Sequence, residues 1–315
     1  MSEMAIEARG LVKRYGDLTA VDGIDLQVAS GTIYAMLGPN GAGKTTTINM
    51  LTTLARPTSG AARVAGCDVL RQADQVRSRI GVTFQDIVLD QDLTGRQVLD
   101  IHGRLYRQSG DLRRKRIADL VELVQLGEAI DRVVKTYSGG MKRRLELARG
   151  LMTDPAVLFL DEPTQGLDPQ NRASIWSYIR DLNRQRGLTL LLTTHYMEEA
   201  EALASQVGIV DHGKLVAQGT PASLVAQLGA DVIRVRGDGD SGNFVAAIKA
   251  MAFVERVECD GDSANLSVYV DSGSRRLVEI LAASGGNGYR IEDVTVARPS
   301  LGDVFLHYTG RALRD

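Results

Sequence analysis

Residues Gly38 to Thr46 combine glycines, a lysine and hydroxyl groups in a spacing that suits the binding of phosphate. The segment reads Gly-Pro-Asn-Gly-Ala-Gly-Lys-Thr-Thr and follows an apolar run that ends at Leu37. Glycines allow backbone N–H groups to turn inward around an anion, and a helix that begins there adds its positive end. In this pattern Lys44 reaches the β- and γ-phosphates of a nucleotide, and the Thr45 hydroxyl holds Mg²⁺. The predicted nucleotide-binding residues of this segment are Gly38, Pro39, Asn40, Gly41, Ala42, Gly43, Lys44, Thr45 and Thr46.

A pair of adjacent carboxylates, Asp161 and Glu162, follows the apolar run from Val157 to Leu160, and Pro163 then turns the chain. Such a run is typical of a buried parallel strand, which delivers both carboxylates to its carboxyl end. One carboxylate there can hold the Mg²⁺ shell while its neighbour polarises a water molecule. We therefore predict that Asp161 is a metal ligand and that Glu162 is the general base.

Gln85 and His195 also stand at the ends of predicted strands. Gln85 comes directly after the segment Ile80 to Phe84, and His195 follows the strand Thr189 to Leu192 and two threonines. Because ligands gather at the carboxyl ends of parallel strands, Gln85 is a candidate for contact with the metal or the attacking water. An ordinary loop amide is the alternative for Gln85, and a structural role is the alternative for His195. The convergence of three strand ends favours a γ-phosphate contact for His195.

A second predicted anion site lies at Tyr137 to Met141, just before a predicted helix from Lys142 to Met152. Ser138 is placed to cap this helix, and Gly139 and Gly140 expose amides at its positive end. A capped helix after a flexible turn is the alternative interpretation.

The opening segment of the chain is predicted to place the side chain of Tyr15 upstream of the phosphate-binding residues. Apolar residues alternate there, at Ile6 and Ala8 and again at Leu26 and Val28, which predicts two or three antiparallel strands. Tyr15 falls at the tip of one strand, where an exposed ring could stack on a purine base. An ordinary strand tyrosine is the alternative.

Helical patterns account for most of the remaining first two thirds of the chain. A helix is predicted at Thr45 to Leu54, an amphipathic helical insertion at Thr94 to Leu126, and a further helix from the turn at Asp168 through Leu182. The basic run Arg113 to Arg116 has no interleaved aromatic residues, so it is predicted to be a solvated helix face. It does not indicate nucleic-acid binding.

The periodicity restarts beyond Gly229 as a separate unit. Strands and helices are predicted there in the order βαββαβ, which matches a small ferredoxin-like domain, and a last helix runs from Leu301 to Tyr308. The predicted organisation is therefore a large α/β domain at residues 1–220, with a helical part at about 86–150, a linker helix at 221–229 and a C-terminal α+β domain at 230–315. No cluster of catalytic residue types stands out in the C-terminal domain, for which we predict a role in assembly.

Composition narrows the possible partners. There are 37 Lys and Arg against 39 Asp and Glu, so the overall charge indicates neither nucleic acid nor an anionic membrane surface. Cys67 and Cys259 lie in no metal-type spacing and are predicted to be free cytosolic thiols. No apolar run approaches the roughly 18 residues of a spanning helix. We expect a chain that is soluble by itself and that reaches a membrane only through a partner.

With these residues in hand, positions 4 to 220 closely resemble the ATP-binding subunits of ABC transporters. The matching motifs stand in the family's order: the phosphate-binding loop, Gln85, the Ser138-Gly139-Gly140 signature, the pair Asp161-Glu162, the D-loop residue Asp168 and the switch residue His195. The resemblance implies ATP and Mg²⁺, with Thr45, Gln85 and Asp161 at the metal. It also implies a head-to-tail homodimer, in which the signature of one chain closes on the nucleotide held by Lys44 of the other.

Two motifs depart from the common family pattern. The signature reads Tyr-Ser-Gly-Gly-Met from Tyr137 to Met141 where Leu-Ser-Gly-Gly-Gln is commonest, and Gln165 stands where serine is usual in the D-loop. The Ser-Gly-Gly core is intact, so the resemblance still implies an ATP sandwich.

Two further segments resemble the daunorubicin-type and antibiotic-resistance exporters, namely Tyr137 to Leu145 and Arg298 to Leu306. This resemblance implies an ATPase that powers efflux of a drug, antibiotic or lipid-like substrate through a separate membrane permease, at the cytoplasmic face of the cell membrane. The alternatives are an importer ATPase and a non-transport ABC ATPase acting on ribosomes or DNA. The ribosomal class carries two phosphate-binding loops in one chain and the DNA class carries a long coiled coil, and this sequence has neither feature.

Overall fold

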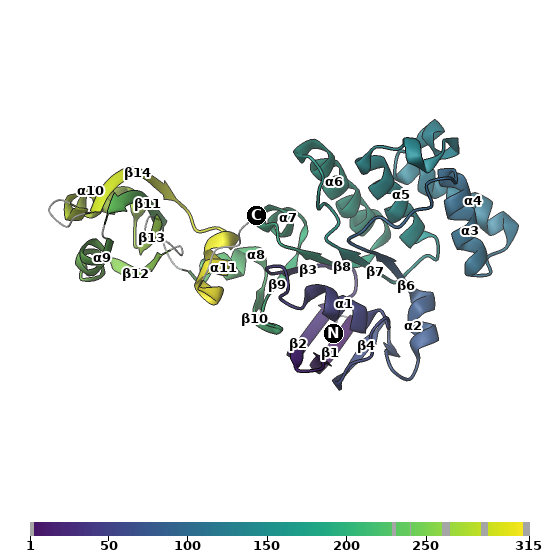
Figure 1. The fold of residues 1–315 in the computed structure, drawn as a ribbon, viewed down its shortest axis with the longest axis horizontal. Coiled ribbons are helices and arrows are strands. Elements are labelled where there is room, and N and C mark those ends of the chain that lie inside the picture. Colours follow the sequence, from purple (N-terminus) through teal and green to yellow (C-terminus); the bar gives the residue numbers. More distant parts are fainter. Residues whose placement is uncertain (1–2, 229–230, 240, 260–264, 285–288, 311–315) are drawn as a thin grey trace. The chain divides into compact units, whose positions relative to one another are not determined.

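The computed structural model describes residues 3–228, 231–239, 241–259, 265–284 and 289–310. The chain divides into two compact units, Met1–Leu215 and Val216–Asp315. Figure 1 colours the first unit from purple to green and the second from green to yellow. None of the described helices is long and apolar enough to cross a membrane.

The first unit begins with an antiparallel sheet in the order β2-β1-β4-β5. Its strands are β1 (Met4–Tyr15), β2 (Leu18–Ala29), β4 (Ser59–Val64) and β5 (Cys67–Asp68). Along β1 and β2 the apolar side chains of Ile6, Ala8, Leu26 and Val28 are buried, as their alternation requires. The predicted antiparallel strands are confirmed, and Tyr15 ends β1 opposite Leu18 at the tip of the hairpin.

A second sheet has the order β10-β9-β3-β8-β7-β6, and the division between the two units falls within β10. These strands are β3 (Ile33–Leu37), β6 (Ile80–Thr83), β7 (Val157–Asp161), β8 (Thr189–Thr194), β9 (Gln206–Asp211) and β10 (Lys214–Gly219). The strands β3, β6, β7, β8 and β9 pair in parallel. Every residue of β3, β7 and β8 is buried, which explains their uninterrupted apolar sequences. The carboxyl ends of β3, β6, β7 and β8 therefore meet at one edge.

The helices of the first unit fall into two groups. The first group is α1 (Lys44–Leu51), α2 (Ala73–Arg79), α6 (Pro169–Arg186) and α7 (Met197–Leu203). The second group is α3 (Gly95–Leu105), α4 (Gly110–Leu123), the short 3₁₀ turns Gly127–Asp131 and Val134–Thr136, and α5 (Gly139–Leu151). Figure 1 shows α3, α4 and α5 gathered at one end of the unit, apart from the antiparallel strands.

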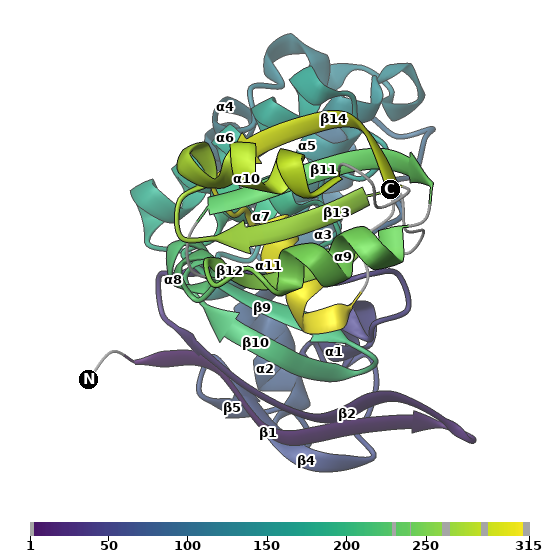
Figure 2. The ribbon, with the colours of Figure 1, turned by 90° about the vertical axis from the view of Figure 1, so that its left-hand side faces the viewer.

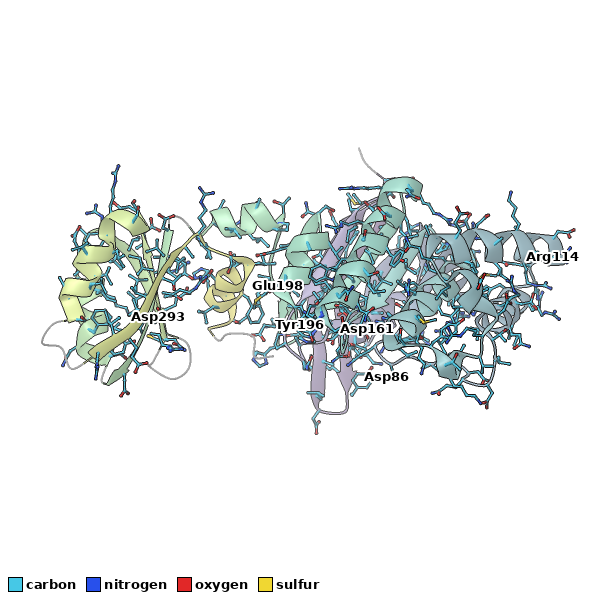
Figure 3. All side chains as sticks on the ribbon, turned by 90° about the horizontal axis from the view of Figure 1, so that it is seen from above. Asp86, Arg114, Asp161, Tyr196, Glu198 and Asp293 are labelled. Atoms are coloured by element: carbon cyan, nitrogen blue, oxygen red, sulfur yellow. The ribbon has the colours of Figure 1, made fainter. Side chains whose placement is uncertain are left out.

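In the structure the predicted helical insertion at Thr94 to Leu126 contains two helices, because Arg107 adopts a left-handed backbone conformation and Ser109 caps a new helix. The expectation for the basic run needs correction. Within the basic run, Arg114 projects into solvent (Figure 3), but Arg113 and Arg116 are largely covered and pair with acidic residues. The run is therefore only partly a solvated face.

The second unit contains a four-stranded antiparallel sheet in the order β12-β13-β11-β14. Its elements are α8 (Pro221–Ala226), β11 (Asp231–Gly239), α9 (Ser241–Lys249), β12 (Val254–Cys259), β13 (Asn265–Val270), α10 (Gly273–Ser284), β14 (Tyr289–Ala297) and α11 (Leu301–Thr309). The two βαβ halves interleave, since β13 lies between β11 and β12, and β11 lies between β13 and β14. This order confirms the predicted ferredoxin-like α+β fold.

Helices α9 and α10 cover one face of that sheet (Figure 2). Phe244, Ile248 and Ile280 from these helices join Ile233 and Val268 of the strands in one apolar core. The last helix, α11, packs against α8 and buries Leu301, Val304 and Phe305. These three side chains of α11 are therefore covered within the chain itself, whereas Tyr308 is 38% exposed.

Candidate nucleotide-binding and hydrolysis site

The phosphate-binding loop connects β3 to α1 and lies against neighbouring backbone. Gly43 has a left-handed φ of 102°, and a Cβ there would stand 2.4 Å from the Ala20 carbonyl oxygen. A Cβ on Gly38 would stand 2.3 Å from the Val210 carbonyl oxygen. Larger residues would push the loop out of place. No side chain caps α1, so amides of its first turn are available to an anion.

A cavity of about 420 Å³ opens at this loop. This volume is within the range of small-molecule sites. The residues that line the cavity come from the β1–β2 hairpin, the loop and α1, and the ends of β6 and β7: Tyr15, Leu18, Ala20, Asn40, Gly41, Gly43, Lys44, Thr45, Thr46, Gln85 and Glu162. The structure thus brings together the predicted base-stacking, phosphate-binding and water-orienting side chains.

Tyr15 is half exposed at the rim of this cavity. The Lys13 ammonium lies 4.7 Å from the centre of its ring and donates a hydrogen bond to the Arg56 carbonyl. This contact supports the ring from the protein side.

Lys44 is buried, with 4% of its side chain exposed, at the floor of the cavity. Its ammonium group donates to the carbonyls of Gly38 and Pro39, at 2.7 and 3.0 Å, and lies 3.5 Å from Glu162 Oε1. Burial lowers the pKa of Lys44, while the neighbouring carboxylates of Glu162 and Asp161 oppose that shift. The cation therefore faces the position where the loop would hold phosphate.

Asp161 sits in the interior of the first unit (Figure 3) and gathers two hydroxyl groups. Thr45 Oγ1 donates to Asp161 Oδ1 at 3.1 Å, and Thr193 Oγ1 donates to the same oxygen. A hydroxyl, a carboxylate and the nearby Gln85 amide are hard oxygen donors of the kind that Mg²⁺ accepts beside substrate phosphates. The described residues contain no cluster of three His, Cys, Asp or Glu that could hold a metal ion by themselves.

Glu162 is held in a strained conformation. Its φ of 46° is left-handed, which costs a non-glycine residue on the order of 1–3 kcal/mol. The backbone N–H of Glu162 donates to the hydroxyl and the carbonyl of Thr193, at 3.1 and 3.2 Å. This turn directs the side chain of Glu162 toward Lys44.

His195 Nδ1 lies 3.1 Å from Glu162 Oε2, but no hydrogen bond joins the two atoms. Both atoms are buried without a hydrogen-bond partner in the described part of the chain. Buried polar atoms are rarely left unpaired, so this pair fits a site that a bound water or phosphate oxygen completes.

Gln85 donates from its side-chain amide to Gln165 Oε1 at 2.7 Å. The two glutamines lie 80 positions apart, and the contact orients Gln85 at the wall of the cavity. Gln165, which stands where the family usually has serine, therefore has a side-chain partner in Gln85.

The remaining predicted residues lie outside the cavity of the single chain. Ser138 caps α5 by accepting from the Met141 N–H, as predicted, although α5 begins at Gly139 and not at Lys142. Asp168 caps α6 by accepting from the Asn171 N–H, and this hydrogen bond lowers the pKa of Asp168. Gly139 and Gly140 form the first turn of α5. A signature role for these residues therefore requires a nucleotide bound elsewhere.

Sequence reasoning missed two side chains that organise the site, Thr193 and Arg143. Thr193 links the carboxylate of Asp161 to the backbone of Glu162. Its position two residues before His195 is the one signal for it in the sequence. Arg143 donates to backbone carbonyls next to the site, and nothing in a basic helical stretch distinguishes it from its neighbours.

Comparison with known proteins agrees with this geometry. Residues 21–165 match the ABC transporter family. The chain is 46% identical over 312 residues to the daunorubicin resistance ATP-binding protein DrrA3 of Streptomyces coeruleorubidus, covering 98% of this chain and 97% of that protein. It is 43% identical to the daunorubicin/doxorubicin resistance ATP-binding protein DrrA of Streptomyces peucetius, covering 99% and 94%. It is 42% identical to the Nod factor export ATP-binding protein I of Paraburkholderia xenovorans, covering all of both chains.

Solved structures resemble this chain over 68–71% of its length. The protein cbiO1 of Clostridium perfringens, part of an ABC transporter complex, matches with a TM-score of 0.67 and 26% identity, over 71% of this chain and 92% of that one. The dimeric structure of MJ0796, a bacterial ABC transporter cassette, matches with a TM-score of 0.62 and 26% identity, over 68% and 98%. The chain aligns almost completely with ATP-binding proteins, and it has the loop, cavity and carboxylates described above. This chain therefore belongs to the ATP-binding proteins of the ABC transporter family and is an ATPase.

Proposed function

We propose that this chain is the ATP-hydrolysing subunit of an exporter, which moves a drug, antibiotic or lipid-like compound through a separate membrane permease. The observation that carries the proposal is the alignment over almost the whole chain, second unit included, with proteins named for drug resistance and for Nod factor export. As a subunit bound to a permease, the chain works at the cytoplasmic face of the cell membrane.

In the proposed hydrolysis step, Glu162 accepts the proton of a water molecule that attacks the γ-phosphate of ATP, the bond between the γ-phosphate and ADP breaks, and ADP leaves. Lys44 and the loop amides neutralise the phosphates, and His195 contacts the γ-phosphate. Thr45, Asp161 and Gln85 would hold Mg²⁺, which neutralises charge on the β- and γ-phosphates. The buried, unpaired atoms Glu162 Oε2 and His195 Nδ1 support this arrangement, because water and phosphate oxygen would satisfy both.

A homodimer would complete the site. The Ser138-Gly139-Gly140 turn, at the positive end of α5, lies outside the cavity that contains Lys44. In a head-to-tail pair of chains, this turn would close on the nucleotide held by the other chain, with Asp168 near the contact. The structure of MJ0796, a cassette similar to this chain, is dimeric, which supports pairing of two chains.

The permease would dock on apolar surface next to Gln85. A cavity of about 260 Å³ lies between the end of α1, β6, α3 and α5, and Leu54, His102 and Tyr106 are in its wall. Exposed apolar side chains stand in the same elements and in the segment after Gln85: Leu54, Ile87, Val88, Ile101, Leu105 and Tyr106. A cytoplasmic helix of the permease in this groove could transmit its movements to Gln85. The second unit would assist assembly.

Transport by inside-out membrane vesicles tests the proposal. The full chain is co-expressed with its membrane subunit, ATP is added outside the vesicles, and uptake of a fluorescent anthracycline is measured. An exporter accumulates the compound inside such vesicles, whereas the Glu162→Gln chain does not. ATP-driven release instead of uptake would indicate an importer. ATP hydrolysis that the membrane subunit leaves unchanged, with no movement of any tested compound, would support a non-transport ATPase.

A further inference from the structure

Arg143 is buried in α5 with all of its hydrogen-bonding capacity used. A guanidinium carries five N–H donors. In Arg143 these donors reach five acceptors: the carbonyl oxygens of Phe84, Asp161, Glu162 and Pro163, at 2.6, 3.1, 2.9 and 2.6 Å, and Glu146 Oε2 at 3.0 Å. Its side chain is 3% exposed. One side chain therefore joins α5 to the end of β6 and to the end of β7.

Glu146 extends these contacts toward the segment that follows Gln85. Its side chain is fully buried, and it accepts from the Val88 N–H at 3.2 Å. Arg149 donates to the Val88 carbonyl at 2.9 Å and lies 3.4 Å from Glu146 Oε1. The pair Arg143 and Glu146 thus holds both ends of the stretch from Phe84 to Val88.

The three successive carbonyls bound by Arg143 surround the peptide groups of Glu162. Because Glu162 is left-handed, its conformation persists only where its surroundings enforce it. Thr193 fixes the N–H side of this turn, and Arg143 fixes the carbonyl side. The planar fork of arginine suits several carbonyls in a way that a lysine ammonium does not.

We propose that Arg143 is a positioning residue for ATP hydrolysis, which holds the strained backbone of Glu162 and the strand end before Gln85 in one frame through its contacts with their carbonyl groups. The proposal rests on the proposed role of Glu162 as general base. Because α5 begins with the Ser138 turn, Arg143 also ties the predicted signature to that base. Arg143 touches no reacting atom and acts through Glu162 and Gln85.

The test compares two variants of the full chain with the original chain. Arg143→Lys keeps a cation beside Glu146 but cannot reach all four carbonyls. The double change Arg143→Met with Glu146→Met removes both charges together, because a single removal would leave the other buried and unpaired. We expect kcat to fall about tenfold in the first variant and about a hundredfold in the second, as small misplacements of catalytic groups can cause. The dissociation constant of a non-hydrolysable ATP analogue should change less than about threefold in both, since the phosphate-binding loop is intact.

Arg144→Met is the matched control. Arg144 stands next in the same helix and donates to the carbonyl of Gln125 and to the Tyr178 hydroxyl, away from the β6 and β7 ends. It should retain turnover within about twofold of the original chain. Equal turnover in the Arg144→Met chain and the double methionine chain, both folded by thermal melting, would overturn the proposal. If the double variant does not fold, Arg143→Lys alone decides, and unchanged kcat in that chain overturns the proposal.

A double-mutant cycle that combines Arg143→Lys with Glu162→Gln distinguishes a role of Arg143 in positioning Glu162 from a merely structural role. If Arg143 acts through Glu162, Arg143→Lys should cause almost no further loss of single-turnover hydrolysis when Glu162 is already glutamine. An undiminished loss in that background contradicts the positioning role. Wild-type turnover in Glu162→Gln by itself would instead remove the base assignment on which the proposal rests.

Discussion

The two units of this chain both contain sheets covered by helices, but they differ in which charged side chains they bury. The first unit buries Lys44, Arg143, Asp161 and Glu162 near the strand ends. In the described residues of the second unit, Asp303 is the one buried charged side chain. Asp303 is fully engaged, because it closes the capping box of α11 with Ser300 and pairs with Arg234.

The contrast is clearest in the atoms left without hydrogen bonds. Glu162 Oε2 and His195 Nδ1 face one another unpaired in the first unit. In the second unit, the unpaired nitrogens of Arg256 lie beside Glu258 and belong to a guanidinium stacked 3.8 Å from the centre of the Tyr269 ring. Burying charge costs stability, so the two unpaired atoms of Glu162 and His195, at neighbouring strand ends, suit a place that a ligand completes.

The largest effect should come from Glu162→Gln, which keeps the shape of the side chain but removes the base. We expect turnover to fall at least about a hundredfold while ATP still binds, so that the closed dimer accumulates. ATPase rate and size-exclusion chromatography with ATP measure the two effects. Glu198→Gln, on the exposed side of α7, is the control and should leave turnover unchanged. Turnover of the Glu162→Gln chain within a factor of about three would contradict the assignment.

Lys44→Ala should act one step earlier than Glu162→Gln. The lysine neutralises the β- and γ-phosphates before and during reaction, so ATP affinity should fall about ten- to a hundredfold. Calorimetry measures the affinity, with Lys135→Ala as a control at an exposed position. Equal ATP binding in the Lys44→Ala and original chains would count against the assignment.

A smaller loss is expected at the rim of the cavity. Tyr15→Ala should weaken ATP and GTP alike by about tenfold, because ring stacking accepts any purine. Tyr15→Phe should bind both nucleotides nearly as well as the original chain. A phenylalanine defect as large as the alanine defect would assign the effect to the hydroxyl group instead.

Acid should affect the first unit through His102. Burial lowers the pKa of His102 from 6.5 to about 4, with Arg149 adding to the shift. As the pH falls below 6.5, His102 is therefore protonated in the unfolded chain before it is protonated in the folded chain, which favours unfolding. The stability that neutral His102 allows is present above pH 6.5 and is lost as the pH falls toward 4. His102→Gln should remove about 1–2 kcal/mol of the acid dependence, measured by urea unfolding across this range. An unchanged acid dependence would show that His102 is not responsible.

The smallest effect on catalysis should come from Asp303→Asn in the second unit. Loss of the charge weakens the contacts with Arg234 and Ser300, so we expect local destabilisation of about 1–3 kcal/mol. Hydrogen exchange in α11 measures the destabilisation, and ATP hydrolysis should keep its rate. A clear fall in kcat would show that the second unit contributes to the reaction and would remove the contrast between the units.

Much of the architecture could be predicted from local patterns. The apolar runs of β3 and β7, the alternation in β1 and β2, and the order βαββαβ each depend on residues close together in sequence. The break at Arg107 inside the predicted helical insertion could not be placed from the sequence, because the amphipathic pattern continues across it and a left-handed residue at a non-glycine position leaves no sequence signal.

The candidate site shows the same division. Residue types and spacing predicted the phosphate-binding loop, the carboxylate pair and the strand-end residues, since each motif has a local chemical logic. Only the tertiary structure shows that Gln85 is hydrogen-bonded to Gln165 and that Thr193 joins Asp161 to Glu162. It also shows that all the N–H donors of Arg143 have acceptors. These contacts join residues as many as 80 positions apart. The sequence determined which chemistry is available, and the packing of separate strand ends determined which groups are held in place to perform it, because distances between distant segments exist only in the tertiary structure.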